Sequence, residues 1–257
     1  MKASAERRPR VASRPNQLPG PLSSWAYFFD IDGTLVDIAP SPSEIILERD
    51  LQALVRRLYE ATGGALALIS GRSISDVDSI FGDAQLPVAG QHGLERRSRT
   101  GKITRHEVMA EKLDFARARL GKAISRHSDL LLEDKGLSLA LHYRAAPSLA
   151  SFAHRTMRGV AATIGPEFAL QSGKRGVELK PSGKDKGDAV LEFMREEPFH
   201  GRTPVFVGDD VTDEHGFLVV NSLEGHSIKV GGGPTAARWR LANVRAVQSW
   251  LERRDTE

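Results

Sequence analysis

The chain has 257 residues, 40% hydrophobic and 27% charged, so it can bury a large core as one domain or as a domain with a smaller insertion. It contains no cysteine, which excludes disulfides, thiolate metal sites and a cysteine nucleophile, and favours a reducing compartment such as the cytoplasm. No apolar run is long enough to span a bilayer and no signal-peptide core follows Met1, so neither a membrane segment nor export is expected.

The basic charge is concentrated at the amino terminus. Residues 1–23 hold five basic residues, one acidic residue and four prolines, so a formal charge of about +4 lies there in a chain whose total is +3. This composition predicts a disordered basic tail over residues 1–23. A weak contact of the tail with nucleic acid or an acidic surface is the alternative. No nucleic-acid partner is expected, because the basic excess does not lie on a structured face.

The first apolar run, residues 25–29, ends on Asp30-Ile31-Asp32-Gly33-Thr34. If the run is a strand, both carboxylates lie on the same side, because side chains alternate between the two faces. Two acids at the carboxyl end of a strand form a site for a divalent cation and a phosphoryl group. Their repulsion favours a hard, oxygen-seeking ion such as Mg2+. An ordinary Asp-Gly turn is the alternative.

Later segments alternate between short apolar runs and helical spacing. The pattern predicts strands at 65–69, 86–89 and 203–207, and helices at 49–61, 185–195, 212–220 and 246–254. This alternation is typical of an α/β fold, in which helices cover both faces of a parallel sheet. Polar clusters follow two of these strands, at Ser70-Gly71-Arg72 and Gly208-Asp209-Asp210. Because ligands bind at the carboxyl ends of parallel strands, the three clusters are expected to converge on one site.

Residues 109–182 follow a different pattern, with helices near 110–127 and 148–164 and strands near 129–143, 167–171 and 176–180. The sequence therefore predicts a smaller α+β unit at 109–182. This unit is inserted between 24–108 and 183–257, which together form the parallel-sheet domain.

A second acidic group is a candidate for the same site. Asp209 or Asp213 would complete a Mg2+ site with Asp30, in which water and a phosphate oxygen fill the remaining positions. The alternative is that Thr212 or Asp213 caps the following helix.

Lys186 and Ser70 are candidates for holding a phosphoryl group. Lys186 begins a predicted helix, where an anion is also favoured, although surface lysines are common and Lys184 lies nearby. The hydroxyl of Ser70 and the amides of its turn suit phosphate oxygens, although Ser70 could instead cap a helix over 73–81.

Four motifs, taken in chain order, resemble the haloacid dehalogenase (HAD) superfamily of aspartate-dependent phosphohydrolases. They are Asp30-Ile31-Asp32-Gly33-Thr34, Ser70 after its strand, Lys186-Gly187 and Gly208-Asp209-Asp210-Val211-Thr212-Asp213. The resemblance implies a Rossmann-like parallel-sheet core with a cap domain, and the insertion at 109–182 lies where C2-type caps do. Between about residues 25 and 250, shorter strings resemble the trehalose-6-phosphate phosphatase family: Ser70-Gly71-Arg72, Gly90-Gln91-His92-Gly93, Leu141-His142-Tyr143-Arg144, Gly173-Lys174-Arg175-Gly176-Val177-Glu178 and Gly208-Asp209-Asp210-Val211-Thr212-Asp213-Glu214. Gly176 departs from the pattern, because an apolar residue is common there and glycine weakens a strand.

The resemblance implies a role for each matching residue. Asp30 would be the nucleophile and Asp32 the general acid and base, the latter kept protonated by a more enclosed position. The Mg2+ ligands would be Asp30, the backbone carbonyl of Asp32 and Asp209, with Asp213 as a ligand or a residue behind them. Ser70 and Lys186 would bind the phosphoryl group. The sugar hydroxyls would meet a charged set in the cap and its neighbours: Glu133, Lys135, Lys174, Glu178, His92 and Arg72.

The expected function is Mg2+-dependent hydrolysis of trehalose 6-phosphate through an aspartyl phosphate, with a possible functional link to a trehalose-phosphate synthase. One alternative keeps the chemistry and changes the substrate to sucrose 6-phosphate, mannosyl-phosphoglycerate or another hexose phosphate. A second is a non-catalytic sugar-phosphate sensor that regulates a synthase. All expected catalytic side chains are present, which argues against the sensor.

Overall fold

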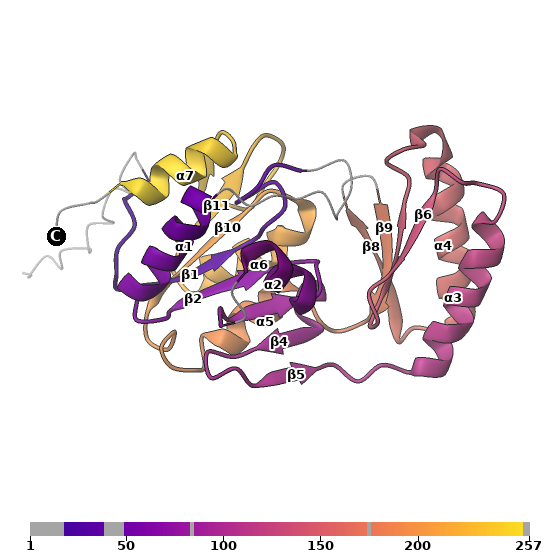
Figure 1. The fold of residues 1–257 in the computed structure, drawn as a ribbon, viewed down its shortest axis with the longest axis horizontal. Coiled ribbons are helices and arrows are strands. Elements are labelled where there is room, and N and C mark those ends of the chain that lie inside the picture. Colours follow the sequence, from indigo (N-terminus) through magenta and orange to yellow (C-terminus); the bar gives the residue numbers. More distant parts are fainter. Residues whose placement is uncertain (1–17, 39–48, 83–84, 174–175, 254–257) are drawn as a thin grey trace, which may run out of the picture.

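The computed structural model describes residues 18–38, 49–82, 85–173 and 176–253. Its strands form an eight-stranded sheet of order β12-β11-β10-β1-β2-β3-β4-β5 and a separate four-stranded sheet of order β6-β7-β9-β8. The two sheets belong to two units that lie side by side along the long axis of the molecule (Figure 1).

The larger sheet is parallel except at one edge. Its parallel strands are β1 (Trp25–Phe29), β2 (Leu66–Ile69), β3 (Val88–Gly90), β10 (Thr203–Gly208), β11 (His226–Val230) and β12 (Trp239–Leu241). The antiparallel strands β4 (Glu95–Arg97) and β5 (Ile103–Arg105) extend it beyond β3. The predicted α/β fold with a parallel sheet is confirmed.

Strand β1 lies between β10 and β2, and alternate residues pack against opposite layers of helices. Trp25, Tyr27 and Phe29 pack with α1 (Arg49–Ala61), α2 (Ile74–Phe81) and α7 (Val244–Glu252). Ala26 and Phe28 pack on the other face with α5 (Lys186–Phe193) and α6 (Glu214–Ser222). Because both faces are covered, all five residues of the strand are buried, which explains the continuous apolar run.

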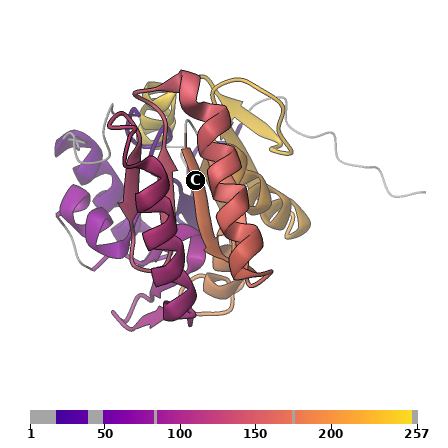
Figure 2. The ribbon, with the colours of Figure 1, turned by 90° about the vertical axis from the view of Figure 1, so that its right-hand side faces the viewer.

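The second unit consists of antiparallel strands covered by helices on one face. The strands are β6 (Leu131–Asp134), β7 (Leu139–His142), β8 (Phe168–Gly173) and β9 (Gly176–Pro181), and the helices are α3 (Ala110–Ile124) and α4 (Ala150–Ile164). Both helices lie on the far side of the sheet from the larger unit, and the second view shows them running along it (Figure 2). The open face of this sheet is therefore turned toward the larger unit.

The predicted tail, residues 1–23, is too long at its carboxyl end. Leu18 is buried in the core, the indole nitrogen of Trp250 donates to the carbonyl of Pro19 at 2.8 Å, and the hydroxyl of Tyr27 donates to the carbonyl of Leu22 at 2.8 Å. Buried N–H and O–H groups need acceptors, and a proline-rich segment still offers its carbonyls. Residues 1–17 lie outside the described part of the chain.

Four strands were not predicted: β4, β5, β11 and β12. Strand β4 has the sequence Glu-Arg-Arg, which does not resemble a buried strand, yet all three residues are buried. Arg97 makes a bidentate ion pair with Asp78 at 2.7 Å, and Arg96 pairs with Glu196 at 2.6 Å and lies over the ring of Phe193. These tertiary partners make the burial of charged residues tolerable.

Among the described residues, no helix combines the length and apolar character needed to cross a membrane.

Candidate active site

Three carboxylates meet at the carboxyl ends of β1 and β10. Asp30 follows β1, Asp209 follows β10, and Asp213 closes the short 3-10 turn Val211–Asp213. Phe29 is in register with Val207, which brings Asp30 beside the loop that starts at Asp209. Each residue offers an oxygen within 4.8 Å of the others, and all three are buried. The predicted convergence of strand-end clusters is therefore observed.

Lys186 is the cation inside this cluster. Its Nζ donates to Oδ1 of Asp30 and to Oδ1 of Asp213, both at 2.6 Å, and its side chain is 2% exposed. Burial disfavours the ammonium, yet Asp213 and Asp30 outweigh burial and raise the pKa of Lys186 above its ordinary value. Lys184, the neighbour with which it could be confused, pairs with Glu192 instead.

Asp213 is held from both sides. Its Oδ1 accepts from Lys186, and its Oδ2 accepts from the backbone N–H groups of Asp209 and Asp210, both at 2.8 Å. Its side chain makes no capping bond as the N-cap of α6, but it accepts from the N–H of Asp210 in the capping box of the 3-10 turn that leads into α6. With both oxygens engaged, Asp213 orients Lys186 and the turn that carries Asp209.

The donor set suits a hard divalent cation. Three carboxylates face the ammonium of Lys186, and that of Lys229 donates to the backbone carbonyl of Asp209, so negative charge remains in excess. Burial, together with Asp213 and Asp209, raises the pKa of Asp30 well above its ordinary value despite the opposing effect of Lys186. Two glycines make room for the carboxylates. A Cβ at Gly33, whose φ is +88°, would lie 1.9 Å from Oδ2 of Asp209, and one at Gly208 would lie 2.4 Å from Cγ of Asp213.

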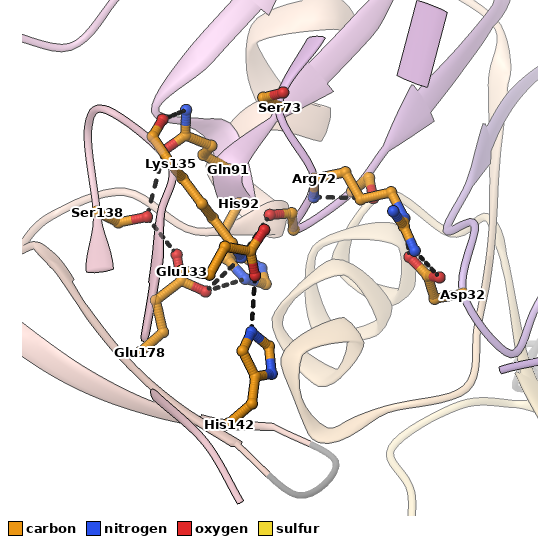
Figure 3. Close-up of polar contacts among 12 residues, drawn as sticks. Asp32, Arg72, Ser73, Gln91, His92, Glu133, Lys135, Ser138, His142 and Glu178 are labelled. Carbon is orange, nitrogen blue, oxygen red and sulfur yellow. Dashed lines mark hydrogen bonds and ion pairs between the residues drawn. The ribbon is translucent and has the colours of Figure 1, made fainter. Parts of the chain in front are cut away.

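Asp32 lies apart from the carboxylate cluster. Its side chain is 33% exposed, whereas that of Asp30 is 6% exposed, so the expectation that Asp32 is the more enclosed acid is wrong. The guanidinium of Arg72 donates two hydrogen bonds to the carboxylate of Asp32, from Nε to Oδ2 at 2.7 Å and from Nη2 to Oδ1 at 2.8 Å (Figure 3). Arg72 therefore holds the carboxylate of Asp32 in this structure.

Ser70 follows β2 and is completely buried. Its Oγ accepts from the backbone N–H of Arg72 at 3.2 Å, whereas Ser73 caps α2 through a capping box with Asp76. The alternative of Ser70 as a helix cap is therefore wrong. Its hydroxyl lies in the turn beside Gly71 and Arg72, both of which line the cavity described below.

The second unit contributes a charged group to the same place. Glu178 accepts from Lys135 at 3.2 Å and from His92 at 3.3 Å through Oε2, and from Ser138 at 2.6 Å through Oε1 (Figure 3). Burial opposes ionisation, but Lys135, His92 and Ser138 together hold the pKa of Glu178 far below its ordinary value. Burial also lowers the pKa of His92 against the pull of Glu178.

Glu133 faces His142 across β6 and β7, with Oε2 2.7 Å from Nε2. His142 was not predicted as a site residue, although it lies in one of the strings that carried the resemblance. Gly176 is in register with His142, and a Cβ on it would approach Nδ1 to 3.3 Å, so the glycine leaves room for the imidazole while β9 still forms. Lys174 lies outside the described residues.

One cavity of about 190 Å³ joins the two units. From the larger unit it is lined by Asp30, Asp32, Arg72, His92, Lys186 and Asp209. From the second unit it is lined by Glu133, Lys135, His142, Arg144, Gln171 and Glu178. Arg144 and Gln171 were also missed: Arg144 lies in the same string as His142, whereas Gln171 is an isolated glutamine with no local signal of a site.

Comparison with known proteins agrees with this arrangement. The family model described as trehalose-phosphatase matches residues 28–245. A trehalose-6-phosphate phosphatase of Escherichia coli is 44% identical over 243 residues, covering 92% of this chain and 88% of that protein. A bifunctional trehalose-6-phosphate synthase/phosphatase of Thermoproteus tenax is 29% identical over 232 residues, covering 87% of this chain and 31% of that protein.

A solved structure shares the fold. The C-terminal domain of the C. albicans trehalose-6-phosphate phosphatase superposes with a TM-score of 0.78 at 21% identity, covering 88% of this chain and 90% of that one. The match of the family model over most of the chain, and the extent of the bacterial similarity, show that the chain belongs to the trehalose-phosphatase family.

Proposed function

We propose that this protein is a phosphatase that hydrolyses trehalose 6-phosphate to trehalose and inorganic phosphate, with Asp30 as the nucleophile. The observation that carries the proposal is the single cavity in which buried Asp30, held by Lys186, faces a charged set of the second unit centred on Glu178. One half of the cavity suits a phosphoryl group and the other a polyol. The choice of trehalose as the sugar rests on the family and on the E. coli relative.

The proposed reaction has two steps. The carboxylate of Asp30 attacks phosphorus in line, and the bond between phosphorus and the sugar oxygen breaks as Asp32 gives that oxygen a proton. Water then attacks the phosphorus of the aspartyl phosphate while Asp32 takes a proton from that water. The bond between Asp30 and phosphorus breaks, phosphate is released and the carboxylate of Asp30 is restored. The carboxylate of Asp32 can exchange a proton with substrate only after its two hydrogen bonds from Arg72 are broken, so substrate binding must rearrange this ion pair.

The proposed metal ligands are Asp30 and Asp209, with the backbone carbonyl of Asp32. Mg2+ bound there would neutralise charge on the transferring oxygens. Lys186 and Ser70 would hold the same phosphoryl group from the protein side. Asp213 would keep Lys186 and the Asp209 loop in place, and with three donors on its two oxygens it has about one acceptor direction left for the metal.

The second unit would act as a C2-type cap over residues 109–182. Carboxylates accept hydrogen bonds from hydroxyl groups and lysines donate them, so Glu133, Glu178 and Lys135 match a neutral disaccharide. Lys174 is proposed for the same set on the resemblance alone. Three donors already contact Glu178, which leaves about one of its four acceptor directions for a sugar hydroxyl.

The test is phosphate release with and without Mg2+ from trehalose 6-phosphate, sucrose 6-phosphate and glucose 6-phosphate. We expect Mg2+-dependent release with a strong preference for trehalose 6-phosphate, and none from the Asp30→Asn variant. Equal rates on all three sugar phosphates would support phosphatase activity but contradict specificity for trehalose 6-phosphate. Release by Asp30→Asn would exclude Asp30 as the nucleophile.

A functional link to a trehalose-phosphate synthase is proposed on a narrower basis. The T. tenax relative is named as both synthase and phosphatase, and this chain matches 31% of its length. Coupled assays with a separate synthase, in which the rate of trehalose formation is compared with the sum of the two isolated steps, would test whether the two proteins act together.

A further inference from the structure

Two residues that do not line the cavity connect the two units directly behind it. Gln91 is 2% exposed and Ser138 is completely buried, and neither contributes to the cavity wall. Gln91 belongs to the larger unit, in the short 3-10 turn Gln91–Gly93 after β3, and Ser138 lies just before β7 in the second unit. They lie behind Lys135 and Glu178, which do line the cavity (Figure 3).

The side-chain amide of Gln91 bridges the turn between β6 and β7. Its Nε2 donates to the backbone carbonyl of Lys135 at 2.8 Å, and its Oε1 lies 3.2 Å from Oγ of Ser138. Ser138 donates its one hydroxyl proton to Oε1 of Glu178 at 2.6 Å, so its contact with Gln91 is one of packing and the hydrogen bond of Gln91 to the turn is the one to Lys135. On the other side of the turn, Nζ of Lys135 donates to the carbonyl of Gly71 at 3.0 Å. The turn of the second unit is thus fastened to the larger unit at two points.

The backbone of Gln91 is itself tied to the loop that follows β2. Its N–H donates to the carbonyl of Arg72 at 2.8 Å, and the N–H of His92 donates to the carbonyl of Ser70 at 2.9 Å. Both residues adopt left-handed φ values, 48° for Gln91 and 58° for His92, which are unfavourable for side chains of this size. Such strain persists where the surroundings hold it, and it is concentrated at functional sites.

We propose that Gln91 is a positioning residue that sets the place of the cap, and with it Glu178 and Lys135, relative to the phosphoryl site at Ser70 and Asp30. The contacts run without a break from Ser70 through the backbone of His92 and Gln91 to Lys135, Ser138 and Glu178. The inference rests on the proposed function only in that it assigns the sugar to the cap side of the cavity.

The consequence is a division between substrates. A sugar phosphate must reach Asp30 and the cap groups at once, so its turnover depends on the spacing that Gln91 fixes. A small aryl phosphate such as p-nitrophenyl phosphate needs only the phosphoryl site. Loss of the Gln91 bridge should therefore affect the first substrate and spare the second.

The test uses Gln91→Asn and Gln91→Gly in the full chain. Asparagine and glycine tolerate left-handed φ better than glutamine, so neither change adds backbone strain, yet neither side chain reaches Lys135 and Ser138. The matched control is Gln52→Asn, which removes a side-chain amide donor to the carbonyl of Phe81 within the larger unit. We expect kcat/KM for trehalose 6-phosphate to fall about tenfold or more in both Gln91 variants, with p-nitrophenyl phosphate turnover unchanged.

A distance measurement examines the cap directly. Because the chain has no cysteine, Ser128→Cys on the second unit and Ser249→Cys on α7, both exposed, can be spin-labelled without removing other thiols. We expect one narrow distance distribution for the parent chain and a broader one for Gln91→Asn.

Unchanged kcat/KM for trehalose 6-phosphate, or an equal fall on both substrates, would overturn the positioning role, as would an unaltered distance distribution. If the parent chain releases no phosphate from any substrate, the proposed function fails while the distance measurement still decides whether Gln91 holds the cap.

Discussion

At the scale of single residues, the chemistry depends on how each charge is neutralised. Lys186 has two buried carboxylate partners, whereas Asp32 is held by the guanidinium of Arg72, which would have to move for Asp32 to act in the proposed reaction. Two acids one residue apart on the same strand end thus occupy different electrostatic environments. The proposed nucleophile, Asp30, is buried beside a cation, whereas the proposed acid, Asp32, is partly exposed and paired with an arginine.

Lys186 and Lys184 make a matched pair for testing this. We expect Lys186→Met to lower the free energy of unfolding by about 3–5 kcal/mol without Mg2+, because two buried carboxylates lose their cation, and to abolish measurable turnover. Lys184→Met, which removes a partly exposed pair with Glu192, should cost at most about 1 kcal/mol and keep activity. Urea unfolding and phosphate release check both. Similar losses from the two variants would contradict the assignment of Lys186.

At the scale of elements, the same residue type performs different tasks three positions apart. Ser73 caps α2: its side chain accepts from the N–H of Asp76, and the carboxylate of Asp76 accepts from the N–H of Ser73. Ser70 follows β2 and lies in the turn beside the cavity. The helix therefore has its own cap, which leaves Ser70 available for a ligand.

The two serines should separate stability from catalysis. We expect Ser73→Ala to reduce the free energy of unfolding by about 1 kcal/mol while kcat stays within about twofold, because only a capping bond is lost. Ser70→Ala should instead lower kcat by about tenfold to a hundredfold, because a donor to the phosphoryl group is lost. Thermal unfolding and phosphate release distinguish the two. Retained turnover in Ser70→Ala would remove this residue from the site.

At the scale of the whole molecule, the two units meet through a buried polar network rather than an apolar interface. Glu178 is its centre, since its carboxylate receives donors from both units: His92 from the larger one, and Lys135 and Ser138 from the second. A buried network of this kind is stable while every member keeps its partner and its charge. The position of the cap is therefore coupled to the ionisation of one glutamate.

The stability of the protein should accordingly depend on pH through Glu178. Because the pKa of Glu178 is lowered in the folded state, protons bind first to the unfolded chain, and stability is lost as pH falls below the ordinary value of 4.5. We expect Glu178→Gln to be less stable than the parent at pH 7 by about 3 kcal/mol, with the difference shrinking between pH 5 and 3.

Urea unfolding at pH 7, 5 and 4 measures this, with the exposed Glu60→Gln as a control that should follow the parent at every pH. A constant difference between Glu178→Gln and the parent would show that the charge of Glu178 does not stabilise the fold.

Much of the architecture could be predicted from local patterns. The apolar run of β1 with its two aspartates, the alternation of strands and helices, and the order of the four motifs were sufficient for the α/β fold and for the family. Strands β4, β5, β11 and β12 escaped because they are short or, like Glu95-Arg96-Arg97, rich in charge that only tertiary partners neutralise.

The sequence by itself determined which groups gather at the strand ends, because Asp30, Ser70 and Asp209 each follow a predicted strand of one parallel sheet. Only the tertiary structure decided the partners of these groups: Arg72 on Asp32, Lys186 between Asp30 and Asp213, and Gln91 behind Lys135. The reason is physical, since Lys186 and Asp30 are 156 positions apart and their contact follows from sheet register and burial. Neither the sheet register nor the burial of these groups can be read from a local sequence pattern.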